Sequence, residues 1–441
     1  MQGDAATLER ELSDTPGRGR RLQMYAMLMG YIASLKIPRF AIASLVPFMV
    51  EELGLPATVL PTLLAAFHPG YIASMMPGGK AVQTFGSKPV ILMGTLGTAL
   101  SFTLFPLAAR TNRPVVALCS LMAVSGLFQG PMAPSLGQAS RDWMPTRSAG
   151  DKIEKAWALK FQMLSHTAAP ALSALITPRI AARYGWRRVV ALYGAAGVLF
   201  GLLFQLTASS KPRAEGQPKT ATVAATAAIA SKPSWAMFKL PAVHAIMAYH
   251  IAYDNMNQTM VALAPTMFMR KFGLSPVQMS TYVSAAQAVH IPFGFMVTGI
   301  ETFLLKLGWP VLKIRKTMTG WGSLIEAVLA VAYGAARTPL QAAIAYALLD
   351  SAAQLHSSGA WPNFMEVGGE WSAMLYAVDN TFAQQTAILV PFMGIGMQQL
   401  TGSWLPHLLF GAGLKLLSGG LFVLNASVTP AQEQLAARRK N

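Results

Sequence analysis

Two stretches of this chain decide its fold, because they repeat each other. They read VPFMVEELGLPATVLPTLL (Val46–Leu64) and APTMFMRKFGLSPVQMSTYV (Ala264–Val283). Pro47 and Pro265 lie 218 residues apart, and Gly54 and Gly273 lie 219 residues apart. An offset of about half the chain predicts an internal duplication into two similar halves.

A third match near the end of each half supports the duplication. The segment GWRRVVALYGAAG, which begins at Gly185, resembles GSWLPHLLFGAG, which begins at Gly402. Trp186 and Trp404 are again 218 residues apart. One offset at three distant places indicates a true repeat, since chance likeness between apolar segments would scatter the offsets.

The composition places this repeat in a membrane. Of 441 residues, 53% are hydrophobic and 12% are charged, and the mean hydropathy is +0.41. Soluble domains carry about 25% charged residues, so a bilayer is the natural solvent for this chain. Its single cysteine, Cys119, excludes an intrachain disulfide, and no Cys/His spacing typical of zinc sites occurs, so we expect no bound metal.

Twelve apolar runs approach the length of about 20 residues that spans a bilayer. We therefore predict an all-α integral membrane protein with twelve transmembrane helices in two six-helix bundles. In the first half the runs cover residues 23–50, 58–78, 89–108, 114–138, 157–180 and 188–207. In the second half they cover residues 241–267, 277–300, 316–336, 340–363, 372–398 and 404–425.

Basic residues set the expected orientation. The formal net charge is +17, but the basic residues lie in short segments between apolar runs and form no patch with aromatics, so we expect no nucleic-acid partner. Placing both termini in the cytosol puts about 23 Lys and Arg inside and about 9 outside, as the positive-inside rule favours.

The alternation of apolar runs and polar segments divides the chain into five parts. We predict a cytosolic tail (1–21), an N-terminal bundle (22–208), a cytosolic connector (209–239), a C-terminal bundle (240–428) and a cytosolic tail (429–441). A run of small residues at 221–230 is too short to span a membrane, and we expect the connector around it to be solvated and to contain a surface helix. The membrane itself, plasma or organellar, is left open.

Several short motifs follow one another in the order found in a known family. They are VPFMVEELG after Arg39, FHPGYIASMMPGG, GLFQGPMAPSL, GWRRVVALYG, LAPTMFMRKFGLS, KIRKTM, SSGAWPNFME and DNTFAQQTAILVPFMG. From about Leu22 to Val428 the chain resembles the anion:cation symporter branch of the major facilitator superfamily. That branch includes organellar phosphate, sialic acid, vesicular glutamate and bacterial sugar-acid transporters. The resemblance implies the major facilitator fold, a small anionic substrate, a monomer in the lipid bilayer and no cofactor beyond a coupling Na⁺ or H⁺.

Two departures from the family pattern affect gating and coupling. The family's gating loop between helices two and three corresponds here to Gly79, Gln83, Gly86 and Lys88, and Gln83 stands where the family has an aspartate. In helix four, Met122 and Gln129 stand where proton-coupled relatives have an arginine and an acid. Because an amide does not titrate, the coupling ion is left open.

Lys36 and Arg39 are the main candidates for substrate binding. A charged side chain in mid-membrane costs about 2.5 kcal/mol or more, so it needs a function or a partner. The two lie three residues apart and therefore on one helical face. The planar guanidinium of Arg39 suits a carboxylate or phosphate, and the matching arginine of the resembling family contacts the anion. A structural ion pair inside the bundle is the alternative.

The repeat offset carries Lys36 to Asp254. Asp254 is a lone acid in an apolar run and is predicted either to pair with Lys36 across a central cavity or to titrate and couple transport. Asp350 and His356 are secondary candidates for coupling.

Uncharged polar residues at motif positions complete the candidate binding site. They are Tyr71, Gln162, Asn363 and Asn380. Each could instead form an ordinary hydrogen bond between helices.

The sequence thus predicts a secondary transporter of a small organic carboxylate or of phosphate, working by alternating access and coupled to a cation. No catalytic residue is expected, because no phosphate-cradling loop or nucleophile with a base partner occurs in the polar segments. Two alternatives stay open: an uncoupled facilitator of the same class, and a non-transporting membrane sensor that keeps the fold.

Overall fold

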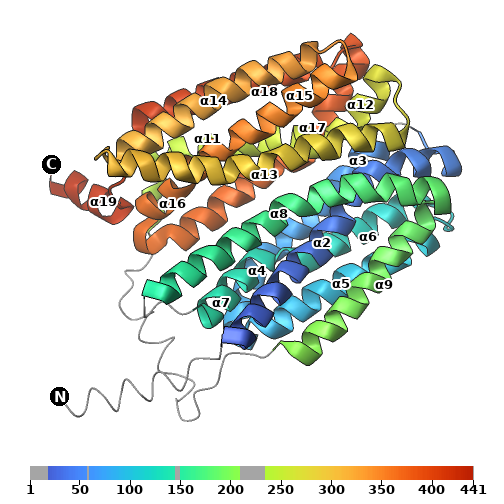
Figure 1. Cartoon of the computed structure of the whole chain (residues 1–441), viewed down its shortest axis with the longest axis horizontal. Helices are drawn as coiled ribbons and strands as arrows, with labels where there is room; N and C mark the ends of the chain where they lie inside the picture. The colour runs from blue at the N-terminus through green and yellow to red at the C-terminus, as the bar shows by residue number, and fades with distance from the viewer. Residues whose placement is uncertain (1–17, 57–58, 145–148, 209–233, 441) are drawn as a thin grey trace. The chain divides into compact units, whose positions relative to one another are not determined.

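A computed structural model describes residues 18–56, 59–144, 149–208 and 234–440 (Figure 1). Every regular element among them is a helix. The N-terminal residues 1–17 and residues 209–233, which make up most of the connector in which a surface helix is expected, lie outside the described residues.

The first half contains six helical segments among the residues described. They are α2 (Arg18–Leu53), α3 with α4 (Val59–Ala65 and Phe67–Phe85), α5 (Ser87–Ala108), α6 with α7 (Pro114–Gln129 and Met132–Trp143), α8 (Ala149–Tyr184) and α9 (Trp186–Thr207). Each contains one predicted span. The helices extend past the spans by up to about two turns, because helical hydrogen bonding continues where the side chains become polar.

The second half repeats this pattern after a short helix, η1 (Trp235–Lys239). Its segments are α11, η2 and α12 (Pro241–Gln258, Thr259–Leu263 and Ala264–Phe272), α13 (Pro276–Lys306), α14 (Val311–Ala335), α15, η3 and α16 (Pro339–Ala352, Ala353–Ser357 and Ala360–Gly368), α17 (Ser372–Thr401) and α18 (Leu405–Asn425). A short turn, η4 (Gly369–Trp371), precedes α17, and α19 (Ala431–Lys440) ends the described chain. Capping boxes start two of these helices, with Ser275 capping α13 and Thr338 capping α15.

The described residues group into two compact units. The first takes its residues from Met1–Arg39, Pro69–Ala169 and Arg187–Ala230, and the second from Phe40–His68, Pro170–Trp186 and Ser231–Asn441. Within the first unit α5 packs against α6 and α7. Within the second, α11 packs against α17 and α18, and α14 packs against α15 and α18. The bundle bounds expected from the sequence remain a prediction.

Backbone geometry supports the internal repeat. The paired glycines Gly54 and Gly273 both have left-handed φ angles, 60° and 65°, where α2 and α12 end. Gly185 and Gly402 likewise have φ of 81° and 69° at the ends of α8 and α17. Glycine reaches this region without steric cost, so both halves end corresponding helices by the same device.

Glycines also allow helices to cross closely. A Cβ atom on Gly70 of α4 would lie 1.9 Å from the Ala123 carbonyl oxygen of α6, and one on Gly130 would lie 2.0 Å from Ser74 Oγ. In the second unit a Cβ on Gly359 would lie 2.4 Å from Thr319 Oγ1. Small residues at crossings are typical of membrane helices, which gain packing when their backbones approach.

Seven of the described helices are long and apolar enough to cross a membrane by length and composition. The other five predicted spans lie in α8, α11, α14, α15 with α16, and α17. Of these, α15 and α16 are each shorter than 18 residues, at 14 and 9 residues. Several polar side chains of these spans bond to one another inside the second unit.

Candidate functional site

The two predicted anion-binding cations lie in the first unit. Lys36 and Arg39 are partly buried on α2. Lys36 Nζ lies 3.4 Å from the His166 carbonyl oxygen of α8. The Arg39 guanidinium lies 5.6 Å from the ring centre of Tyr71 on α4. Such a cation–π contact holds a guanidinium flat while its N–H donors stay directed to the sides. Three predicted residues, Lys36, Arg39 and Tyr71, are therefore brought together.

Gln162 lies elsewhere in the same unit. It is buried on α8, and its Nε2 atom lies 3.2 Å from Ser140 Oγ of α7. This is an interhelical hydrogen bond of the ordinary structural kind. Its role in substrate binding stays a prediction.

The two asparagines lie in the second unit. Asn380 is buried on α17. Asn363 of α16 is fully buried, and its amide nitrogen lies 2.9 Å from Glu366 Oε2 and 2.8 Å from the Ser427 carbonyl oxygen. The donors of Asn363 therefore hold α16 against the segment after α18.

The three predicted coupling residues also lie in the second unit. Asp254 is buried on α11 and accepts a hydrogen bond from Gln384 Nε2 at 3.2 Å. Asp350 Oδ2 lies 3.1 Å from His290 Nδ1. His356 stacks on the Tyr253 ring with centroids 4.2 Å apart. Since Lys36 belongs to the first unit and Asp254 to the second, their pairing remains a prediction.

A buried cluster next to Asp254 was not expected from the sequence. His250, one helical turn before Asp254, bonds through Nδ1 to Asp379 Oδ2 of α17. The other imidazole nitrogen, Nε2, lies 4.0 Å from Asp254 Oδ1. A lone acid in an apolar run was the available signal for Asp379, because the same reasoning had selected Asp254.

A second unexpected feature is a fully buried ion pair. Lys415 Nζ of α18 lies 2.9 Å from Glu326 Oε1 of α14, and both side chains are at most 1% exposed. The ammonium also lies 3.2 Å from Tyr249 Oη and 4.3 Å from the centre of that ring. Lys415 is one lysine in the apolar run LLFGAGLKLLSGG, so its cost in the membrane was visible in the sequence.

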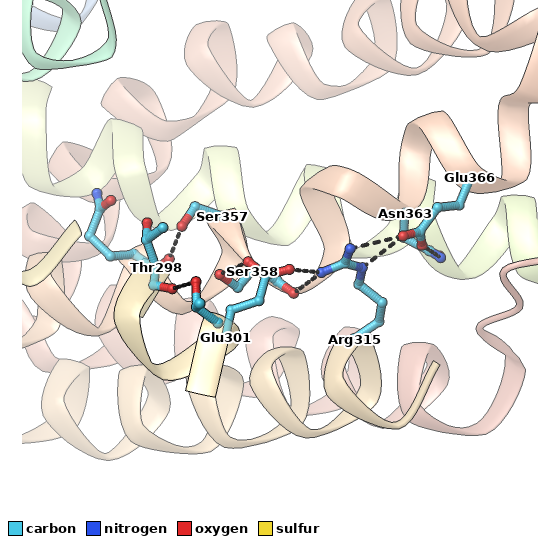
Figure 2. A network of polar contacts seen from close by, with 9 residues as sticks. Thr298, Glu301, Arg315, Ser357, Ser358, Asn363 and Glu366 are labelled. Carbon is cyan, nitrogen blue, oxygen red and sulfur yellow. Dashed lines mark hydrogen bonds and ion pairs between the residues drawn. The ribbon is translucent and has the colours of Figure 1, made fainter. Parts of the chain in front are cut away.

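A third network links three helices and Ser358 at another place in the second unit. Figure 2 shows the Arg315 guanidinium of α14 between two carboxylates. Its Nη1 atom lies 2.6 Å from Glu301 Oε1 of α13, and its Nη2 atom lies 2.9 Å from Glu366 Oε1 of α16. Ser358, which follows η3, donates to Glu301 at 2.6 Å. Charge-assisted bonds of this kind fix the relative positions of the helices.

The predicted gating segment is mostly helical. Gly79 and Gln83 lie inside α4, which continues to Phe85, and Gln83 is exposed. The break between α4 and α5 is Gly86, with φ of 86°. Lys88 Nζ donates to the Gln205 carbonyl oxygen of α9 at 3.0 Å. At the repeat offset of 218, Gln83 corresponds to Glu301, so the second half has an acid where the first has an amide.

Residues 28–391 match the sequence profile of the Major Facilitator Superfamily. The chain belongs to this superfamily. The predicted family and the all-α membrane fold are thereby confirmed, and a transporter rather than an enzyme is the class that the superfamily represents. The chain is a multi-pass integral membrane protein.

Individual relatives of this superfamily member are distant. It is 24% identical to sialin of Ovis aries over 82% of this chain and 74% of that one. It is 22% identical to "Probable anion transporter 4, chloroplastic" of Oryza sativa subsp. japonica, covering 76% of this chain and 56% of that one. The crystal structure of a D-xylose-proton symporter is similar in fold, with a TM-score of 0.70, 13% identity, and 92% and 98% of the two chains covered.

Proposed function

We propose that this protein carries a small anion, an organic carboxylate or phosphate, across a membrane by alternating access. The observation that carries the proposal is the placement of Lys36 and Arg39 on one face of α2, with the Arg39 guanidinium 5.6 Å from the Tyr71 ring. Two positive charges in one membrane helix favour an anion. The rice relative, named as a probable anion transporter, supports the same class.

Arg39 is the proposed primary contact with the substrate. Its fork of N–H donors matches two oxygens of a carboxylate or phosphate, whereas Lys36 supplies a point charge. Hydrogen bonds to charged groups contribute about 1.5–3 kcal/mol each, so replacing Arg39 by alanine should raise the half-saturating anion concentration about 10- to 100-fold.

Uptake into proteoliposomes tests this role. Labelled phosphate, gluconate, glutamate and sialic acid are offered to wild type, Arg39→Ala, Arg39→Lys and, as a matched control, the exposed Arg188→Ala. We expect uptake of one anion, nearly lost in Arg39→Ala, reduced in Arg39→Lys and unchanged in Arg188→Ala. Equal uptake by Arg39→Ala and wild type would contradict the proposed contact. No uptake of any anion by folded protein would favour the sensor alternative.

We also propose that transport is coupled to a cation, Na⁺ or H⁺. Imposing each gradient separately in the same vesicles tests coupling. Accumulation above the outside concentration under one gradient supports it, and equilibration to equal concentrations under both supports an uncoupled facilitator.

A further inference from the structure

The connection between α13 and α14 carries a group of lysines that reach the surface. It reads LLKLGWPVLKIRK over residues 304–316. Lys306 ends α13, and Lys313 and Lys316 lie three residues apart near the start of α14, and therefore on one helical face. Lys306 and Lys313 are exposed and Lys316 is half-buried. These three residues are called the Lys313 surface below.

The acids near the Lys313 surface are already engaged. Glu301 and Glu366 both bond to Arg315, and Glu301 also accepts a hydrogen bond from Ser358. Among the described residues, no ion pair joins a lysine of the Lys313 surface to an acid. The four basic residues of the connection thus face two acids, and a surplus of positive charge is left at the surface.

The other half of the repeat shows how the protein can hold such a lysine itself. At the offset of 218, Lys306 corresponds to Lys88, whose Nζ donates to the Gln205 carbonyl oxygen at 3.0 Å. In the second half, Lys313 Nζ lies 4.0 Å from the centre of the Trp309 ring. A cation–π contact orients an ammonium without cancelling its charge. The Lys313 surface therefore keeps its charges available to a partner outside the chain.

The Lys313 surface lies at the level of the lipid headgroups. Lys306 follows the predicted span 277–300 by six residues, or about 9 Å of helix, and Lys313 precedes the span 316–336 by three residues, or about 4.5 Å. The headgroup layer reaches about 5–7 Å beyond the hydrocarbon, and a lysine side chain extends along apolar surface to place its ammonium there. Apolar side chains beside the lysines are also exposed, Phe303 by 60% and Leu307 by 59%.

A second tryptophan and lysine lie at the same end of the second unit. In η1, Trp235 is 68% exposed and Lys239 is exposed. Leu312 of α14 packs against the buried cluster that contains Met237 of η1, so η1 lies beside the start of α14. Tryptophan is typical of the membrane–water interface, and lysine is enriched in the loops that flank it on the cytosolic side. Two segments far apart in the sequence therefore mark the same depth in the membrane.

We infer that the Lys313 surface binds the phosphate headgroups of anionic phospholipids. The inference is independent of the proposed transport, because a lipid can bind without any movement of an anion across the membrane. In the orientation that the basic residues favour, this surface faces the cytosolic leaflet, where anionic lipids attract basic segments next to membrane spans.

A lipid suits the Lys313 surface better than a soluble anion does. Exposed ion pairs contribute little, so a free anion gains little from lysines in contact with water. The acyl chains of a phospholipid keep its phosphate at the membrane surface, where the effective concentration is high. The exposed apolar side chains of Phe303 and Leu307 lie where such chains begin.

Native mass spectrometry of the full-length protein in detergent tests the inference. Phosphatidylglycerol and phosphatidylcholine with identical acyl chains are added separately, and the bound lipid is counted. The test variant combines Lys306→Gln, Lys313→Gln and Lys316→Gln. The matched control combines Arg110→Gln, Arg113→Gln and Arg337→Gln, which remove three exposed charges from connections expected on the opposite side of the membrane.

We expect wild type and the control to bind phosphatidylglycerol more tightly than phosphatidylcholine, with about a fivefold contribution from each lysine of the Lys313 surface. The triple glutamine variant should lose most of this preference, and the corresponding triple arginine variant should keep it. Salt at about 1 M, where charges are screened beyond about 3 Å, should remove the preference from wild type. Unfolding temperatures in detergent without added lipid should agree among the four proteins.

Three results would overturn the inference. Equal affinity of wild type for the two lipids would leave the surface to an acidic partner in solution. An unchanged preference in the triple glutamine variant would place lipid binding elsewhere on the protein. Displacement of phosphatidylglycerol by an excess of inorganic phosphate, at constant ionic strength, would mean that the lysines form a site for a soluble anion. Since no transport is measured, none of these results bears on the proposed function.

Discussion

Lys415 shows what a charge inside a membrane helix requires. Its ammonium lies against the Glu326 carboxylate and against the hydroxyl and ring of Tyr249, all within the second unit. Removing one member of a buried pair leaves an uncompensated charge and costs about 3–5 kcal/mol. We therefore expect Lys415→Met and Glu326→Gln each to lower the thermal unfolding temperature strongly in detergent.

The double variant should recover much of this loss, since a buried pair contributes little beyond neutralising its own members. Lys306→Met, at an exposed lysine of the same unit, is the control and should change stability little. Additive losses in the double variant would mean that the two residues act separately.

Glu154 gives a pH-dependent contribution outside the predicted spans. The two hydrogen bonds from Arg21, both 2.8 Å, lower the pKa of the Glu154 carboxyl from its ordinary value of 4.5, and the Tyr25 hydroxyl donates a third bond. Because the pKa is lower in the folded chain than in the unfolded one, the pair stabilises the fold above pH 4.5 and loses this effect as pH falls through the folded pKa.

We therefore expect Glu154→Gln to cost about 1 kcal/mol or less at pH 7 and progressively less as the pH falls below 4.5. Unfolding temperatures of wild type and variant, measured across this pH range, should converge at the acidic end. A constant difference would show that the variant acts through packing instead.

Sequence reasoning identified individual charges better than it identified their partners. Asp254 was found because it is a lone acid in an apolar run, and Asp379 and Lys415 carried the same signal. The partner of Asp379 is His250, 129 positions earlier, and the partner of Lys415 is Glu326, 89 positions earlier. Neither distance equals the repeat offset of 218, so pairs within one half of the chain could not be derived from the duplication.

At the scale of elements, the close crossing of α4 and α6 depends on Gly70. Any Cβ there would collide with the Ala123 carbonyl oxygen at 1.9 Å, which only a backbone shift relieves. We expect Gly70→Ala to destabilise the protein by about 1–3 kcal/mol, as overpacking usually does. Thermal unfolding in detergent measures this loss.

Gly79 on the same helix is the matched control, because a Cβ there meets nothing within 4 Å. Gly79→Ala should leave stability unchanged or raise it by up to about 1 kcal/mol through better helix propensity. Equal destabilisation by both substitutions would show that α4 tolerates no added methyl group and that the crossing is not the cause.

The helical segments were predictable from apolar length, whereas their interruptions were not. The span predicted at 340–363 is divided into α15, η3 and α16, and the one at 241–267 contains the π-helical segment η2. His356 of η3 stacks on the Tyr253 ring, and Thr259, the first residue of η2, bonds to His407. Composition alone carries no information about such contacts.

At the scale of the whole molecule, the predicted twelve-helix topology depends on whether α14 crosses the membrane. It is not among the seven helices that qualify by length and composition, yet a twelve-helix chain requires it to cross. Two of its four charged residues are paired: Arg315 bonds to Glu301 and Glu366, and Glu326 bonds to Lys415. Pairing inside the protein removes most of the cost of inserting these charges, so we predict that α14 crosses the membrane.

Cysteine labelling tests this crossing and the orientation together. The chain has one cysteine, so Cys119→Ser provides a background for single cysteines at the exposed residues Lys306, which ends α13, and Arg337, which follows α14. In right-side-out vesicles we expect an impermeant maleimide to label Arg337→Cys at once and Lys306→Cys only after permeabilisation. The opposite pattern would reverse the orientation that the basic residues favour and keep the fold. Labelling of both from one side would mean that α14 does not cross, because its two ends would then lie on the same face of the membrane.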